Sequence, residues 1–262
     1  MKASIVPARR GARWLAEGWR AFRAAPFGWL LLVFAYLFVT QLAAVVPLVG
    51  SAAAAICIPA FTVGFMAVTR HALRAGGLDL RLIFEGFRLD LRRQLVLGAA
   101  YLGCGLAVLG ATVLADLDGA LRGVLAGERA PETLTPAALV GPLAAFGAAY
   151  TPVMMLFWFA PPLCAWHGAG VVKALFFSFF ACLMNWRAFL VYGAVAAAVL
   201  FAANALLVAA MMLGAASPGR QQMMSFVFPL LLLMLPTLFA SFYASYRDVF
   251  GEPQPAGAGA AV

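Results

Sequence analysis

The chain contains six apolar stretches that are long enough to cross a lipid bilayer and that contain no Asp, Glu, Lys or Arg. A helix needs about 20 apolar residues to span the hydrocarbon of a membrane. The stretches are residues 27–46, 51–69, 95–114, 137–160, 188–213 and 223–246. Hydrophobic residues make up 65% of the chain and charged residues 11%, whereas a soluble domain has about 25% charged residues. The sequence therefore predicts an all-α membrane protein with six transmembrane helices and excludes a soluble globular domain.

Residues 1–26 are basic and form an amphipathic pattern at helical spacing. The arginines and Glu17 fall on one face. The opposite face carries Trp14, Leu15, Trp19 and Phe22. Such a helix suits the membrane interface, where tryptophan rings lie at the level of the headgroups. A cleaved signal peptide and a mitochondrial presequence are the alternatives, but the apolar run 27–46 is longer than the core of a signal peptide.

Two later connections are predicted to form similar interfacial helices. In residues 80–92, Leu, Ile and Phe residues share one helical face, while Glu85 and several arginines share the other. Residues 170–185 are rich in phenylalanine and have Lys173 as their only charged residue. We therefore expect this third helix to be buried more deeply than the first two.

Three short segments within these helices are alike, namely Glu17–Trp19, Glu85–Phe87 and Phe177–Phe179. Each has a small residue before an aromatic one, and each precedes an apolar span. They predict a three-fold internal repeat, in which every unit is an interfacial helix followed by a hairpin of two spans. Chance similarity among amphipathic stretches is the alternative, and the third segment has Phe-Ser where the others have Glu-Gly.

The basic residues predict the orientation of the chain. With six spans, 15 of the 18 Lys and Arg residues lie on the side of the termini, and three lie opposite: Arg122, Arg129 and Arg220. The positive-inside rule therefore places both termini in the cytoplasm of a bacterial inner membrane and residues 115–136 outside it. The expected organisation is a basic helix in 1–26, a membrane domain in 27–250 and a disordered tail in 251–262.

The arginines of the interfacial helices are the candidate binding residues. The predicted contacts with anionic lipid headgroups are made by Arg9, Arg13, Arg20, Arg81, Arg88 and Arg92. The net charge of +8 could also suit nucleic acid, but these charges lie next to membrane spans, so a lipid surface is the simpler partner. A homo- or hetero-oligomer is compatible with the small residues within the spans.

The sequence predicts no catalytic, cofactor or metal site. The spans contain none of the charged residues that mark an ion path. Gln41 and Asn204 are expected to form hydrogen bonds between helices, or alternatively to line a path for a neutral solute. The histidines and the four cysteines lack the spacing of metal ligands or of a disulfide framework.

Several motifs resemble an uncharacterised bacterial inner-membrane protein family. They are Phe157–Pro162, Phe177–Phe179, Cys182–Trp186 and Tyr243–Phe250, together with 47–50 and 59–64. The family is in turn distantly similar to the membrane domain attached to some glycerophosphodiester phosphodiesterases. The resemblance implies a multi-span plasma-membrane protein and supplies no catalytic residues.

These observations favour a non-enzymatic role as a lipid-contacting scaffold or assembly factor of the cell envelope. The alternative is a carrier or exporter of an apolar or neutral solute. An intramembrane enzyme is disfavoured, because no activated nucleophile, carboxylate pair or metal-ligand set is recognisable. A carrier predicts a central cavity lined by Gln41, Asn204 or threonines, whereas a scaffold predicts a filled interior and a flat basic face.

Overall fold

The computed structural model describes residues 2–116, 119, 123, 136–213 and 220–252. All regular structure in these residues is helical, and they contain no strand. The longer helices are α2 (Pro26–Ala44), α3 (Val49–Ala75), α5 (Leu91–Ala115), α7 (Pro136–Phe157), α10 (Trp186–Leu213) and α11 (Arg220–Phe250). The shorter ones are α1 (Arg10–Ala24), η1 (Leu80–Phe84), α4 (Glu85–Leu89), α8 (Ala160–His167) and α9 (Val171–Met184).

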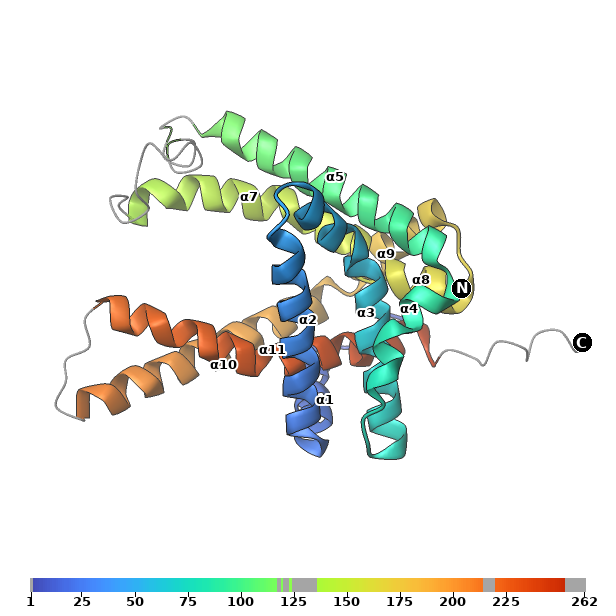
Figure 1. Ribbon diagram of the computed structural model, residues 1–262, viewed down its shortest axis with the longest axis horizontal. Coiled ribbons are helices and arrows are strands. Elements are labelled where there is room, and N and C mark those ends of the chain that lie inside the picture. Colours follow the sequence, from blue (N-terminus) through green and yellow to red (C-terminus); the bar gives the residue numbers. More distant parts are fainter. Residues whose placement is uncertain (1, 117–118, 120–122, 124–135, 214–219, 253–262) are drawn as a thin grey trace, which may run out of the picture.

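The long helices form three hairpins that diverge from a common region (Figure 1). They pair α2 with α3, α5 with α7, and α10 with α11. One short helical segment precedes each hairpin: α1 precedes α2, η1 and α4 precede α5, and α9 precedes α10. The short helix α8 lies between α7 and α9 and was not predicted from the sequence.

Five helical segments among the described residues are long and apolar enough to cross a membrane. They are Pro26–Ala44, Val49–Ala75, Leu91–Ala115, Val140–His167 and Trp186–Leu206. The predicted sixth span, 223–246, lies within α11, which is not one of the five.

Each short helix packs on the second helix of a neighbouring hairpin. The segment η1–α4 packs on α3, α9 packs on α7, and α1 packs on α11 and α10. The first short helix therefore contacts the last hairpin of the chain. This pattern holds the three hairpins together at one end.

Small residues permit these close contacts. A Cβ atom added at Gly18 of α1 would lie 2.3 Å from the carbonyl oxygen of Thr237 in α11. A Cβ atom added at Gly86 of α4 would lie 2.2 Å from the carbonyl oxygen of Ala60 in α3. The corresponding residue of α9, Ser178, instead donates a hydrogen bond of 2.7 Å from its Oγ to the carbonyl of Met155 in α7.

The buried face of α1 differs in part from the predicted one. Trp14 and Phe22 are buried as expected, but Glu17 is also buried and Trp19 is 39% exposed. The predicted buried face is wrong at these positions. Because Gly18 has no side chain, α11 packs closely against the side of α1 that carries Glu17 and Gly18.

The close contact at Gly86 predicts a selective loss of stability. We expect Gly86→Ala to destabilise the protein by about 1–3 kcal/mol, because the methyl group must displace the backbone of α3. Gly103→Ala in α5 is the matched control, since a Cβ atom there meets nothing within 4 Å. Thermal unfolding of the purified protein in detergent measures both, and an equal midpoint for the two variants would contradict the close packing.

Candidate functional site

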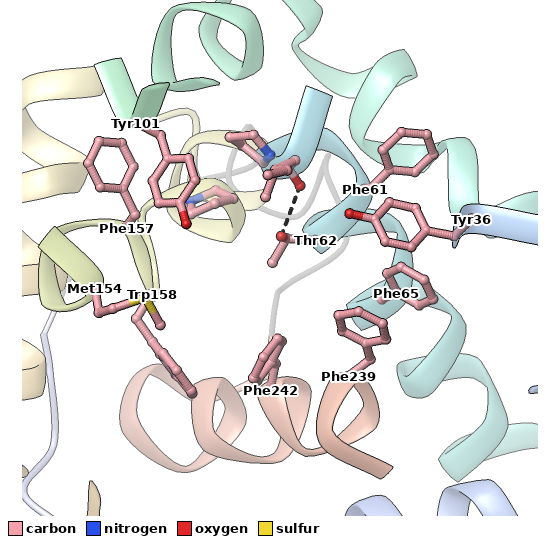
Figure 2. A pocket seen from close by; sticks show the side chains of 13 residues that line it. Tyr36, Phe61, Thr62, Phe65, Tyr101, Met154, Phe157, Trp158, Phe239 and Phe242 are labelled. Carbon is pink, nitrogen blue, oxygen red and sulfur yellow. Dashed lines mark hydrogen bonds between the residues drawn. The ribbon is translucent and has the colours of Figure 1, made fainter. Parts of the chain in front are cut away.

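A cavity of about 190 Å³ lies between the hairpins (Figure 2). All three hairpins contribute to its wall, through α2 and α3, through α5 and the end of α7, and through α11. Its aromatic lining consists of Tyr36, Phe61, Phe65, Tyr101, Phe157, Trp158, Phe239 and Phe242. The remaining wall is formed by Ile58, Pro59, Thr62, Met154 and Pro161. The lining contains no charged residue.

The aromatic rings of the wall support one another. Phe65 of α3 and Phe239 of α11 are stacked, with centroids 4.2 Å apart. Tyr36 of α2 meets both rings edge-on, at centroid distances of 5.4 Å and 6.0 Å. Edge-to-face and offset pairs of this kind add about 0.5–1.5 kcal/mol beyond their burial. This side of the cavity is therefore held by contacts between two hairpins.

Two of the three hydroxyl groups of the lining are already bonded. Thr62 Oγ1 donates to the carbonyl of Ile58 at 2.9 Å, and the hydroxyl of Tyr101 is hydrogen-bonded to that of Tyr150 in α7. The hydroxyl of Tyr36 points into the cavity (Figure 2) and has no hydrogen-bond partner within the described part of the chain. The cavity thus offers one hydrogen-bonding group in an apolar surround.

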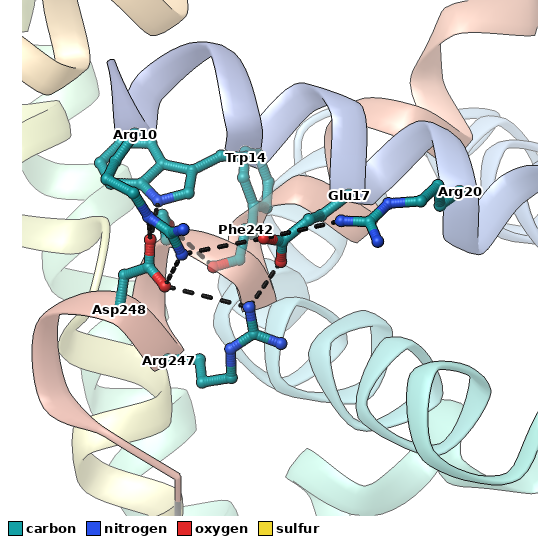
Figure 3. A network of polar contacts seen from close by, with 8 residues as sticks. Arg10, Trp14, Glu17, Arg20, Phe242, Arg247 and Asp248 are labelled. Atoms are coloured by element: carbon teal, nitrogen blue, oxygen red, sulfur yellow. Dashed lines mark hydrogen bonds and ion pairs between the residues drawn. The ribbon is translucent and has the colours of Figure 1, made fainter. Parts of the chain in front are cut away.

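A network of charged residues fastens α1 to the end of α11 (Figure 3). Arg247 Nη2 donates to Glu17 Oε2 at 2.6 Å, and Arg10 forms an ion pair with Asp248. Trp14 Nε1 also donates to Asp248, at 2.7 Å. The hydrogen bond from Arg10 to Asp248 raises the pKa of the Arg10 guanidinium against the opposing effect of burial. Both carboxylates are mostly buried, so their bonds are shielded from solvent.

A second network of the same form fastens α4 to α3. Arg70 Nη2 donates to Glu85 Oε1 at 3.0 Å, and Trp166 Nε1 of α8 donates to the same oxygen at 2.8 Å. In each network, the residue after the glutamate is a glycine that touches the helix bearing the arginine.

The register of the two networks is also the same. Glu85 and Gly86 contact Arg70 and Ala60 of α3, whereas Glu17 and Gly18 contact Arg247 and Thr237 of α11. The residue that the glycine contacts lies ten residues before the arginine, both in α3 and in α11. The sequence identified the two Glu-Gly pairs but not their arginine partners.

The arginines in the short helices and near the ends of the long ones differ in their partners. Arg10, Arg70, Arg93 and Arg247 pair with carboxylates of the protein. The six predicted headgroup contacts are all exposed: Arg9, Arg13, Arg20, Arg81, Arg88 and Arg92. Of these, Arg20 lies 3.8 Å from Glu17, and the side chains of the other five make no ion pair or hydrogen bond with any described residue. These five guanidinium groups are available for an external anion.

The two polar span residues singled out from the sequence do not line the cavity. Gln41 is exposed near the end of α2, and Asn204 Oδ1 is buried without a hydrogen-bond partner among the described residues. Other residues link the helices instead. Gln94 Nε2 donates to the carbonyl of Pro161 at 3.0 Å, and the hydroxyls of Tyr192 and Ser241 lie 2.7 Å apart.

The described residues contain no group of three or more His, Cys, Asp and Glu side chains that could hold a metal ion. Cys57, Cys104, Cys164 and Cys182 are free thiols. His167 Nε2 lies 2.7 Å from the hydroxyl of Tyr246, which gives it a structural partner. The cavity and the exposed arginines are two features of the described structure that could bind a ligand or an anion.

The repeated Glu–Arg pair predicts coupled effects on stability. We expect Glu85→Gln to destabilise the protein by about 1.5–3 kcal/mol, because a hydrogen bond to a charged group is lost. The double variant Glu85→Gln/Arg70→Gln should lose less than the sum of the single variants, because no unpaired charge remains. Arg74→Gln is the control, since its pair with Glu252 is exposed and contributes about 0–1 kcal/mol. Additive effects in thermal unfolding would contradict the pairing.

A comparison with known proteins finds a relative that is described as an inner membrane protein. A probable inner membrane protein of Burkholderia thailandensis is 38% identical over 268 residues, which cover 97% of this chain and 96% of that protein. No protein-family model matches the chain, and no solved structure matches it. The relative agrees with the prediction of an inner-membrane protein, as do the five apolar helices. The chain belongs to the family of this probable inner membrane protein.

Proposed function

We propose that the protein is a non-enzymatic, lipid-contacting scaffold or assembly factor of the bacterial inner membrane. The observation that carries this proposal is the division of the arginines into paired and unpaired groups. Arg10, Arg70 and Arg247 fasten short helices to long ones, and Arg9, Arg13, Arg81, Arg88 and Arg92 are exposed and make no ion pair or hydrogen bond with any described residue. Lipid phosphates are the anions that a membrane protein meets at such positions.

The energy of these contacts is enough to select lipids. A basic residue near an anionic membrane surface contributes about 1 kcal/mol. Arginine can also bind a phosphate through two parallel hydrogen bonds, which adds geometric selectivity. Arg81, Arg88 and Arg92 lie within one short stretch of the chain, so one cluster of anionic headgroups can meet all three.

We propose further that the membrane domain has six spans in three repeated units. The matching registers of the Glu17–Arg247 and Glu85–Arg70 networks support a common origin for the first two units. In the third unit, Ser178 takes the place of the glycine and bonds to α7. The unit has Phe177 in place of the glutamate, so its contact is hydrogen-bonded but uncharged.

Under this proposal both termini lie in the cytoplasm and α11 is the sixth span. The charged residues at the end of α11, Arg247 and Asp248, bond to α1, which supports placing α1 and the end of α11 on one side of the membrane. The resemblance to the membrane domain of glycerophosphodiester phosphodiesterases remains a hypothesis about ancestry. It brings no phosphodiesterase residues to this chain.

A carrier of an apolar or neutral solute is the second candidate, and the central cavity favours it. Repeats that surround a midplane site are common in transporters. However, the lining includes neither Gln41 nor Asn204, and Thr62 is its only threonine. The cavity is small and aromatic, which suits a bound apolar group better than a hydrated path.

The lipid contact can be tested through the lipids that the protein retains. We expect the triple variant Arg81→Gln/Arg88→Gln/Arg92→Gln to retain about fivefold less phosphatidylglycerol and cardiolipin relative to phosphatidylethanolamine. The measurement is mass spectrometry of lipids that co-purify after mild extraction. The control is Arg122→Gln/Arg129→Gln/Arg220→Gln, which removes the same charge from the side assigned to the periplasm. Unchanged enrichment of anionic lipid in the first variant would refute the proposal.

The topology can be tested with alkaline phosphatase fusions, which are active only outside the cytoplasm. We expect activity from a fusion after Glu128 and none from fusions after Gly77 or Gly251, because the basic residues stay inside. Immunoblots of the fusions correct for differences in expression. Activity at Gly251 would place the carboxyl end outside and exclude the six-span arrangement.

A further inference from the structure

We infer that the central cavity binds one acyl chain of a membrane phospholipid. The inference rests on the proposed lipid contact and adds to it a defined site for part of the lipid. Its basis is the chemistry of the cavity wall, the size of the cavity, and the path from the wall to the exposed arginines.

The lining selects a neutral and mostly apolar group. Eight of the lining residues are aromatic, and the others are apolar apart from Thr62, whose hydroxyl is bonded to Ile58. A cluster of aromatic rings could also hold a quaternary ammonium group. However, no carboxylate lines this cavity, and the surrounding helices are apolar enough to lie in hydrocarbon. A cation would lose its hydration there without a counter-charge, so a hydrocarbon chain is favoured.

The size of the cavity suits part of a lipid rather than a whole one. Its volume is about 190 Å³, and an apolar cavity of about 150 Å³ holds one benzene molecule. The cavity therefore accommodates a segment of one chain, and the rest of the lipid must lie outside. The hydroxyl of Tyr36, which points inward, can donate to the ester carbonyl at the head of that chain.

The cavity wall leads to the basic surface. The ring of Phe61 in the wall meets the ring of Phe87 in α4 edge-on, with centroids 4.9 Å apart. The residue that follows Phe87 is Arg88, which is exposed and unpaired within the described structure. A phospholipid whose chain enters beside Phe61 can therefore present its phosphate to the arginines of this segment.

Thr62 provides a way to close the cavity without changing its charge. It lies three residues after Pro59 and eight before Arg70, as Phe239 lies three residues after Pro236 and eight before Arg247. Both Thr62 and Phe239 line the cavity. Thr62→Phe thus introduces the side chain that the matching position of α11 already has, and its ring would occupy the space of the chain.

The test uses phosphatidylglycerol with a photoreactive diazirine in its acyl chain, reconstituted with the full-length protein. Adducts are mapped by peptide mass spectrometry. We expect adducts on Met154 and Phe157 in the cavity, and a decrease of about fivefold or more in Thr62→Phe, because the filled cavity excludes the chain. Adducts on Phe201, which is 76% exposed, should not change. Thr40→Phe is the matched control, because Thr40 also bonds to a carbonyl of its own helix but lies outside the cavity.

Thr62→Leu is a milder substitution for use if Thr62→Phe does not yield folded protein. Equal labelling of Met154 in the wild-type protein and in Thr62→Phe would overturn the inference, as would loss of labelling on addition of tetramethylammonium.

The triple variant of Arg81, Arg88 and Arg92 separates the two proposals. If it keeps the cavity adducts but loses enrichment of anionic lipid, both proposals stand. If it keeps both, the headgroup proposal fails and the acyl-chain site stands.

Discussion

The exclusion of charge from the membrane interior governs this structure. The six apolar stretches contain no Asp, Glu, Lys or Arg, so the charged side chains lie at helix ends, in the short helices and in the connections. Some of these charged side chains pair with one another within the protein, and others are free to bind an external anion. Glu17 and Glu85 each neutralise an arginine at the end of a long helix and fix a short helix in place. Arg9, Arg13, Arg81, Arg88 and Arg92, which have no such partner among the described residues, are exposed, and the proposed lipid contact rests on them.

Hydrophobic length predicted the helices well, because a span leaves a clear signal in the sequence. The predicted first span, 27–46, corresponds to Pro26–Ala44, and the third helix of the interfacial set, 170–185, corresponds to Val171–Met184. The partner of Glu17 could not be found in this way, since Arg247 is 230 residues distant. The cavity could not be found either. Phe65, which is buried, and Phe38, which is 59% exposed, are both phenylalanines in apolar stretches, and only helix rotation distinguishes them.

The contacts of the polar residues in and beside the spans could not be predicted from the sequence either. Gln41 lies within an apolar stretch and Gln94 lies just before one, so the sequence favoured Gln41 as the link between helices. In the structure Gln41 is exposed, while Gln94 is fully buried and bonds to the carbonyl of Pro161. The difference arises because Gln94 faces α8, in which Pro161 and Pro162 lie in the first turn. A sequence shows that a side chain is polar but not which neighbour it meets.

The contact between α1 and α11 bears on how the chain is made. A ribosome completes residues 10–24 long before α11, the helix to which Trp14, Glu17 and Gly18 bind. Until α11 has been synthesised, Arg10 and Glu17 have no Asp248 or Arg247 to bind. Helix α1 therefore lacks this docking partner while the intervening helices are being made. Truncation of the carboxyl-terminal helix would leave the beginning of the protein, as well as its end, without a docking partner.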